Sequence, residues 1–138
     1  MTSDQITVVQ ASWAELQASA GAIAPIFYAR LFELAPGLGE FLPEDASEQK
    51  ERFAEALGLA VRGLDKPAKL ILGLYDLARE QASRGICDCH YDAAGTALLH
   101  ALAQGAKLDA EATAAWSEFY ALIATVMKKA AGSEAAAA

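Results

Sequence analysis

Apolar residues recur every three or four positions along most of this chain, the spacing that gathers side chains on one face of a helix. The clearest run lies near the carboxyl terminus. Its members are Trp116, Phe119, Tyr120, Ile123, Val126 and Met127. The chain also holds 33 alanines and 17 leucines but 10 valines and isoleucines together, so helix-favouring residues far outnumber β-branched ones. The sequence therefore predicts an all-α protein.

The length of the chain limits the number of domains. At 138 residues with 54% hydrophobic residues, it can bury one core and is too short to divide comfortably into two. We expect a single domain over residues 1–131, followed by a disordered, alanine-rich tail at 132–138.

Glycine and proline positions divide the helical pattern into six or seven helices. The expected breaks lie near Gly21, Pro36, Gly63, Gly85 and Gly105. The second helix is expected to begin between Ala22 and Pro25, with the proline in its first turn, and Ser47 is expected to cap the third.

Two glutamines fall on apolar faces of these helices. Gln49 shares its stripe with Phe53 and Leu57, and Gln81 continues the series that contains Leu74 and Leu77. A buried carboxamide needs hydrogen-bond partners, so each glutamine is expected to meet a polar group or a bound ligand.

Charge excludes several kinds of partner. The formal net charge is −7, and no cluster of Lys and Arg offsets it locally, which argues against binding to nucleic acid or to an anionic membrane. No apolar stretch approaches the roughly 20 residues of a membrane-spanning helix. The amino-terminal residues lack the basic and apolar regions of a secretory signal, which predicts a cytoplasmic protein.

Five segments carry a more specific signal. They are Ile6–Trp13 (ITVVQASW), Phe27–Pro36 (FYARLFELAP), Val61–Asp65 (VRGLD), His90-Tyr91, and Ala115-Trp116 with Tyr120. In register from about Thr7 to about Lys128, they resemble the single-domain globins of bacteria and the globin domain of flavohaemoglobins. The resemblance implies a globin fold, with helices packed at about 50° around a haem-sized pocket that binds a diatomic gas such as O2 or NO.

The resemblance also implies roles for particular residues. Tyr28 matches the distal tyrosine, whose hydroxyl donates a hydrogen bond to the bound gas, and Gln49 matches the distal glutamine that assists it. Tyr91 matches the tyrosine on the proximal side of the haem. Arg52, one turn beyond Gln49, would face a haem propionate, and Phe53 is a further candidate for the pocket lining.

Several positions depart from the pattern of the family. The proximal histidine that binds haem iron falls on Gln81, and a carboxamide is a poor iron ligand. The phenylalanine that wedges the haem falls on Leu42, although Phe41 is adjacent. The glutamate that polarises the proximal ligand in flavohaemoglobins falls on Ala131, and their reductase domain has no counterpart in these 138 residues.

The remaining strong ligands for iron are two histidines and two cysteines. His90 would reach the iron if the preceding helix slid or unwound, whereas His100 faces away from Tyr91. Cys87 and Cys89 are too close to link distant parts of the fold, and a cytoplasmic setting would keep them as thiols.

The segment from Cys87 to His90 has several interpretations. It is one residue short of the attachment motif of c-type haem, and it supplies three of the four ligands of a structural zinc site. A thiolate ligand to iron and a redox-sensing thiol pair are further alternatives. The simplest interpretation is a connecting loop with small residues.

Two hypotheses about function follow. In the first, the chain is a haem globin with an atypical proximal side, and Tyr28 and Gln49 steady a gas. In the second, it is a haem-free globin fold that binds another apolar ligand, such as a fatty acid or a tetrapyrrole, or acts as a sensor or interaction module. A weaker third option is an enzyme, since the resemblance to the wider family would suggest oxygen-dependent oxidation of nitric oxide. No nucleophile and base arrangement, phosphate-binding glycine loop or carboxylate pair indicates an enzyme.

Overall fold

The computed structural model describes residues 1–42, 44–106 and 108–137, without the side chains of Phe41 and of 131–137. The described residues form six α-helices, two short 3₁₀ helices (Gln17–Ser19 and Pro36–Phe41) and no strand. The α-helices are α1 (Ser3–Leu16), α2 (Ala20–Leu34), α3 (Ala46–Gly63), α4 (Pro67–Ser83), α5 (Asp88–Gly105) and α6 (Ala110–Ala137). The predicted all-α class is confirmed. The disorder expected for 132–138 stays a prediction.

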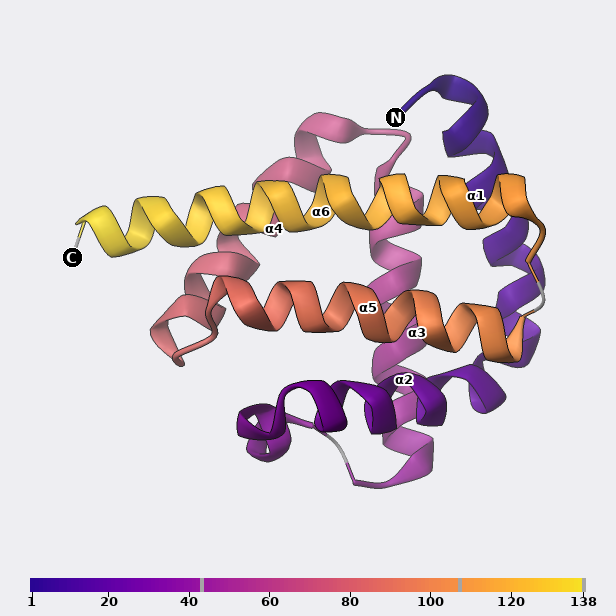
Figure 1. Cartoon of the computed structure of the whole chain (residues 1–138). Coiled ribbons are helices and arrows are strands. Elements are labelled where there is room, and N and C mark those ends of the chain that lie inside the picture. The colour runs from indigo at the N-terminus through magenta and orange to yellow at the C-terminus, as the bar shows by residue number, and fades with distance from the viewer. Residues whose placement is uncertain (43, 107, 138) are drawn as a thin grey trace.

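Helix α5 lies at the centre of the arrangement. It runs between α2 and α6, while α3 crosses behind these helices at a steep angle (Figure 1). Helix α4 packs against α6, and α1 packs against α6 as well. Helices from both ends of the chain therefore enclose one shared core.

Local sequence explains where these helices begin. The Thr2 hydroxyl accepts from the Gln5 backbone N–H, and the Gln5 side chain accepts from the Thr2 N–H, which together form a capping box for α1. At α3 the cap is Asp45, which accepts from the Glu48 N–H, and not the expected Ser47. Both residue types cap helices well, so the sequence alone did not choose between them.

The second helix begins earlier than expected. It starts at Ala20, directly after the 3₁₀ helix, so Pro25 lies inside α2 and not in its first turn. A proline there removes the intrahelical bond to the carbonyl four residues before it, which belongs to Gly21. Gly21 is exposed, so water can replace that bond.

Aromatic side chains fill the core. Trp116 and Phe119 are completely buried, with ring centres 5.3 Å apart in an edge arrangement, and Trp13 lies 6.4 Å from Trp116. The Trp116 indole N–H donates to the Ser12 hydroxyl at 2.8 Å, so its polar atom is satisfied inside the core. These aromatic residues therefore pack the core.

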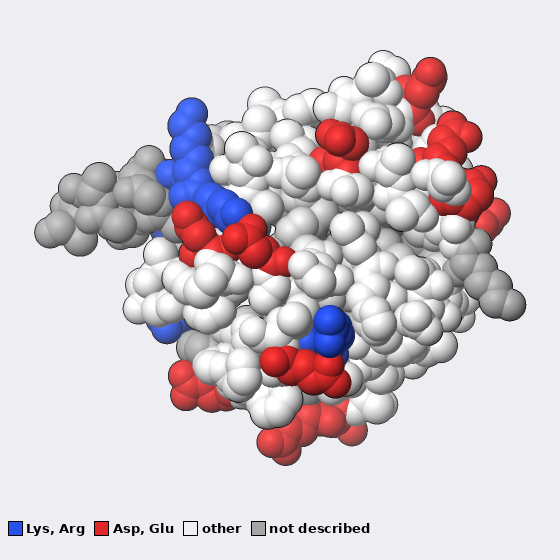
Figure 2. Space-filling model, viewed as in Figure 1, with Lys and Arg blue, Asp and Glu red and all other residues white. Residues whose placement is uncertain are grey.

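Acidic residues outnumber basic ones on the face of the molecule drawn in Figure 2, and that face has no basic patch. Figure 2 shows acidic groups around that face, with the few cations lying beside them. Ion pairs among the described residues include Lys128 with Asp92 and Arg30 with Glu33. Within the described residues, no helix combines the length and apolar character needed to cross a membrane.

Helices α5 and α6 approach each other closely at Gly95. A Cβ atom there would lie 2.5 Å from the ring of Tyr120, whose hydroxyl donates to the Tyr91 carbonyl at 2.6 Å. The ring cannot move without losing this bond. Gly95→Ala should therefore lower the free energy of unfolding by about 1–3 kcal/mol, measured by urea denaturation.

Gly73→Ala is the matched control for this substitution. Gly73 lies inside α4 and has open space around its Cα, so alanine should raise stability by about 0.5–1 kcal/mol through helix propensity. Equal effects of the two substitutions would contradict the close approach at Gly95.

Candidate ligand-binding site

Three of the predicted site residues line one hollow. Tyr28 comes from α2, Leu42 follows the second 3₁₀ helix, and Gln49 lies in the second turn of α3. The hollow has a volume of about 410 Å³ and is also bordered by Phe32 and Gly39. Residues from three segments thus meet as expected. Phe41, the neighbouring candidate, has a side chain outside the described residues.

The hydroxyl of Tyr28 is a free donor within the described part of the chain. Its ring packs edge-on against Phe27 at 5.0 Å, and no described residue hydrogen-bonds to its oxygen. Burial raises the pKa of Tyr28, nearby Arg52 lowers it and Glu48 raises it, with a net increase. The hydroxyl therefore keeps its proton at neutral pH and can donate a hydrogen bond to a ligand in the hollow.

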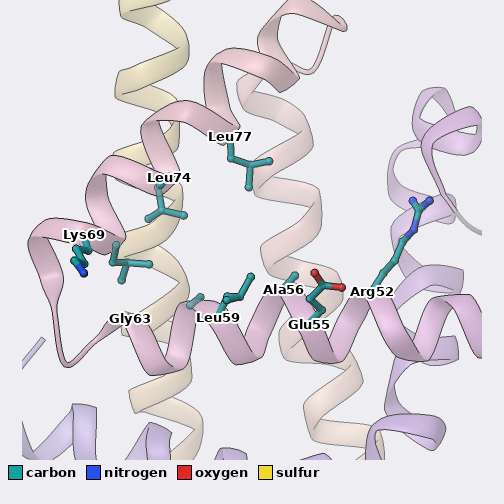
Figure 3. Close-up of a pocket in the computed structure, with 11 residues that line it drawn as sticks. Arg52, Glu55, Ala56, Leu59, Gly63, Lys69, Leu74 and Leu77 are labelled. Atoms are coloured by element: carbon teal, nitrogen blue, oxygen red, sulfur yellow. The ribbon is translucent and has the colours of Figure 1, made fainter.

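A separate groove of about 620 Å³ runs between α3 and α4. Figure 3 shows Leu74 and Leu77 of α4 pointing toward α3, with Ala56 and Leu59 on the opposite wall. The exposed fraction is 59% for Leu59 and 43% for Leu77. The groove therefore presents apolar surface to solvent, as ligand-binding clefts do.

Charged residues border this groove. Arg52, Glu55 and Lys69 line it, and the Arg52 guanidinium also pairs with Glu48 at 2.8 Å. Both partners of that pair are about half exposed, so the pair contributes little to stability and leaves Arg52 able to turn toward a ligand. The groove thus combines apolar walls with exposed cations.

One turn beyond Leu77 on α4, the side chain of Gln81 contacts Tyr91. The Tyr91 hydroxyl donates to the Gln81 carboxamide oxygen at 2.7 Å, and Gln81 is half-buried. Burial, and then the charge of Asp88, raise the pKa of Tyr91, which keeps this donor protonated. The polar partner that Gln81 was expected to need is therefore a neighbouring side chain.

Phe53 occupies the core and neither of the two hollows. Its side chain is 4% exposed, and its ring centre lies 5.4 Å from that of Phe27. The hollow of Tyr28 and the groove of Leu77 share no lining residue, and Phe53 lines neither. Its proposed place in the pocket lining is thus not seen in this structure.

The cysteines and histidines are placed differently from what was expected. Cys87 and Cys89 form a disulfide, so the expectation of two reduced thiols is wrong for this structure. Their Cα atoms are 5.4 Å apart, a separation that allows the bond. His90 Nδ1 accepts from the Cys87 N–H at 3.0 Å and so caps α5, while His100 is exposed.

Sequence reasoning missed the groove. Leu59, Leu70 and Lys69 were not recognised as site residues, although they line it. Two features of the sequence could have indicated the groove. Leu59 lies outside the buried stripe of α3, and α4 carries leucines on more than one face.

The family of this fold follows from comparison with known proteins. A model of the globin family matches residues 27–127, about three quarters of the chain. The chain belongs to the globin family. The family membership predicted from the sequence is therefore confirmed.

Solved structures agree with this fold. This globin is similar to a bacterial globin from Campylobacter jejuni, with a TM-score of 0.81 and 21% identity over 96% of this chain and 97% of that one. It is also similar to hemoglobin of the shortfin mako, Isurus oxyrinchus, with a TM-score of 0.73 and 16% identity over 92% and 96% of the two chains.

A third similar structure is the flavohemoglobin of Malassezia yamatoensis with bound FAD and heme. The TM-score is 0.76 and the identity 21%, over 96% of this globin and 37% of that longer chain. At these identities the likenesses show the fold alone.

Membership of the family implies haem, and the residues of this globin fit it unequally. The free hydroxyl of Tyr28 and the carboxamide of Gln49 suit a polar gas, and the groove offers apolar walls with a cation at its border. Helix α4 contains no histidine or cysteine, and its Gln81 oxygen already accepts from Tyr91. The described residues would therefore offer haem apolar contacts and a cation for a propionate, while α4 would offer its iron no strong ligand.

Replacing Tyr91 with phenylalanine tests the contact with Gln81. Tyr91→Phe leaves the half-buried Gln81 oxygen without its donor, so the free energy of unfolding should fall by about 1–2 kcal/mol in urea titrations. Tyr75→Phe is the control, because Tyr75 lies half-buried on α4, near Gln81 in sequence, and its hydroxyl has no hydrogen bond within the described residues. A similar loss in both variants would refute a specific role for the Tyr91 hydroxyl.

Alkaline pH should destabilise this globin. Burial raises the pKa values of Tyr28, Tyr91 and Tyr120 above the usual 10.0. The folded state then holds protons that the unfolded state releases, so stability is intact below pH 10 and falls as the pH rises above it. Urea midpoints between pH 8 and 11.5 would measure this, and a midpoint that rises above pH 10 would contradict it.

Proposed function

We propose that this globin binds haem between α3 and α4 and a diatomic gas beside Tyr28 and Gln49, with Gln81 in the place of the usual proximal histidine. The observation that carries the proposal is the hollow formed by Tyr28, Leu42 and Gln49. Its tyrosine hydroxyl is protonated and free of partners within the described residues.

Different residues of the chain would contact the haem and the gas. Haem, when bound, supplies the iron that takes the gas. Leu77 and Ala56 would contact its apolar faces, and Arg52 would pair with a propionate at the border of the groove. The hollow of Tyr28 and the groove share no lining residue in this structure, so side chains of α3 would shift when haem enters and join the two. The Tyr28 hydroxyl would then donate a hydrogen bond to the gas, with the Gln49 carboxamide beside it.

Gln81 would bind the haem iron only weakly. The carboxamide oxygen of Gln81 is a poor ligand, and the hydrogen bond from Tyr91 already draws on its electron density. Affinity for haem would then come mostly from apolar contact and from the propionate pair. We therefore expect this globin to lose haem more readily than a globin with a proximal histidine.

Hemin titration tests this proposal. Wild-type protein should shift the Soret band of added hemin, and Gln81→His should bind hemin at least about tenfold more tightly, because an imidazole replaces a poor ligand. Tyr28→Phe should leave hemin affinity unchanged and speed release of the gas by roughly tenfold, the value of one hydrogen bond. Tyr75→Phe is the control for both measurements.

Two outcomes would refute the proposal. One is a spectrum identical to that of free hemin for both the wild type and Gln81→His. The other is a gas release rate that Tyr28→Phe does not change, because the hydrogen bond from Tyr28 would then be absent.

The separate groove favours a second candidate function. Because it is apolar, exposed and distinct from the hollow of Tyr28, it suits a fatty acid or another apolar ligand in a protein without haem. In that case the protein would give no hemin spectrum but would bind cis-parinaric acid. Leu77→Asp should abolish that binding. Leu122→Asp, an equally exposed leucine on α6 outside the groove, should not.

A further inference from the structure

A compact cluster of metal-binding side chains lies at the start of α5. Cys87 precedes the helix, and Cys89 and His90 lie in its first turn. One ligand atom from each lies within 4.8 Å of the other two. None of the three residues lines the hollow of Tyr28 or the groove of Leu77, so the cluster is separate from the proposed haem site.

We propose that Cys87, Cys89 and His90, once the disulfide is reduced, bind one soft cation with a filled d shell, of which Cu(I) is the representative. Two thiolates and an imidazole are donors that Cu(I) prefers. A structural zinc ion takes four protein ligands, whereas the described cluster offers three. Cu(I) is satisfied by three donors or fewer, so the number of ligands favours it.

The backbone already holds the three donors together. The His90 N–H donates to the Cys87 carbonyl at 3.0 Å, which closes the turn that contains both cysteines. Both cysteine side chains are exposed, so an ion or a reductant can reach them. The amino-terminal end of a helix also stabilises negative charge on a thiolate. Little ordering is therefore needed when an ion binds.

Oxidation state would control binding. The disulfide occupies both sulfur atoms, so the oxidised protein offers only His90. Two molecules of a low-molecular-weight thiol would reduce it, giving two electrons and two protons to Cys87 and Cys89 and becoming a disulfide themselves. Binding of Cu(I) then releases the two thiol protons. The His90 nitrogen would exchange its hydrogen bond from Cys87 for the ion.

Competition with a Cu(I) chelator tests the proposal. Protein reduced with dithiothreitol, desalted and kept anaerobic should take one Cu(I) per chain from its bicinchoninate complex. Cys89→Ser and His90→Ala should each weaken binding at least about tenfold, because each removes one of three donors. His100→Ala is the matched control, because it removes the exposed histidine of the same helix and should leave affinity unchanged.

Several results would overturn the proposal. They are equal binding by the oxidised protein, unchanged affinity in Cys89→Ser or in His90→Ala, and displacement of Cu(I) by an equal concentration of Zn²⁺. Circular dichroism of each variant would show that α5 remains folded. Cys87→Ser is a second cysteine variant that preserves the cap, because serine is itself a favoured capping residue.

Discussion

Tyr91 links three helices of this globin through two hydrogen bonds. Its side chain starts in α5 and donates to Gln81 on α4, while its backbone carbonyl accepts from Tyr120 on α6. Both bonds involve half-buried or buried groups, where water cannot readily replace a lost partner. These two hydrogen bonds therefore link α4, α5 and α6 to one another within the core.

The groove follows from how α3 and α4 are joined. A short turn connects them, and Gly63 allows the side chain of Leu70 to lie against the end of α3. Beyond that turn, α4 packs mainly on α6. Leu59 of α3 and Leu77 of α4 consequently stay exposed on the facing sides of the two helices, and the groove remains available to a ligand.

The fold could be predicted from the sequence, whereas the roles of the site residues stay predictions. Helical periodicity gave the class, and the matched segments placed Tyr28, Leu42 and Gln49 around one hollow. Periodicity also showed that Gln81 faces inward, but it does not identify a partner ten residues away on another helix. That contact requires the positions of α4 and α5 relative to each other, which depend on the packing of the whole core.

Other features could not be predicted for related reasons. Phe53 shares a helical stripe with Gln49, yet a stripe has width, and only packing decides that Phe53 contacts Phe27 and not a pocket. The disulfide depends on the turn that brings Cys87 and Cys89 together, and the composition of the chain does not predict that turn. The groove results from the direction that α4 takes after its turn.

The central claim is that a hydrogen-bonded Gln81 stands where an iron ligand would be. A crystal structure of this globin with added hemin tests it most directly. The account predicts haem between α3 and α4, with the Tyr91 hydroxyl still within hydrogen-bond distance of the Gln81 oxygen. Iron bound to His90 or to a cysteine, or haem outside that groove, would contradict it.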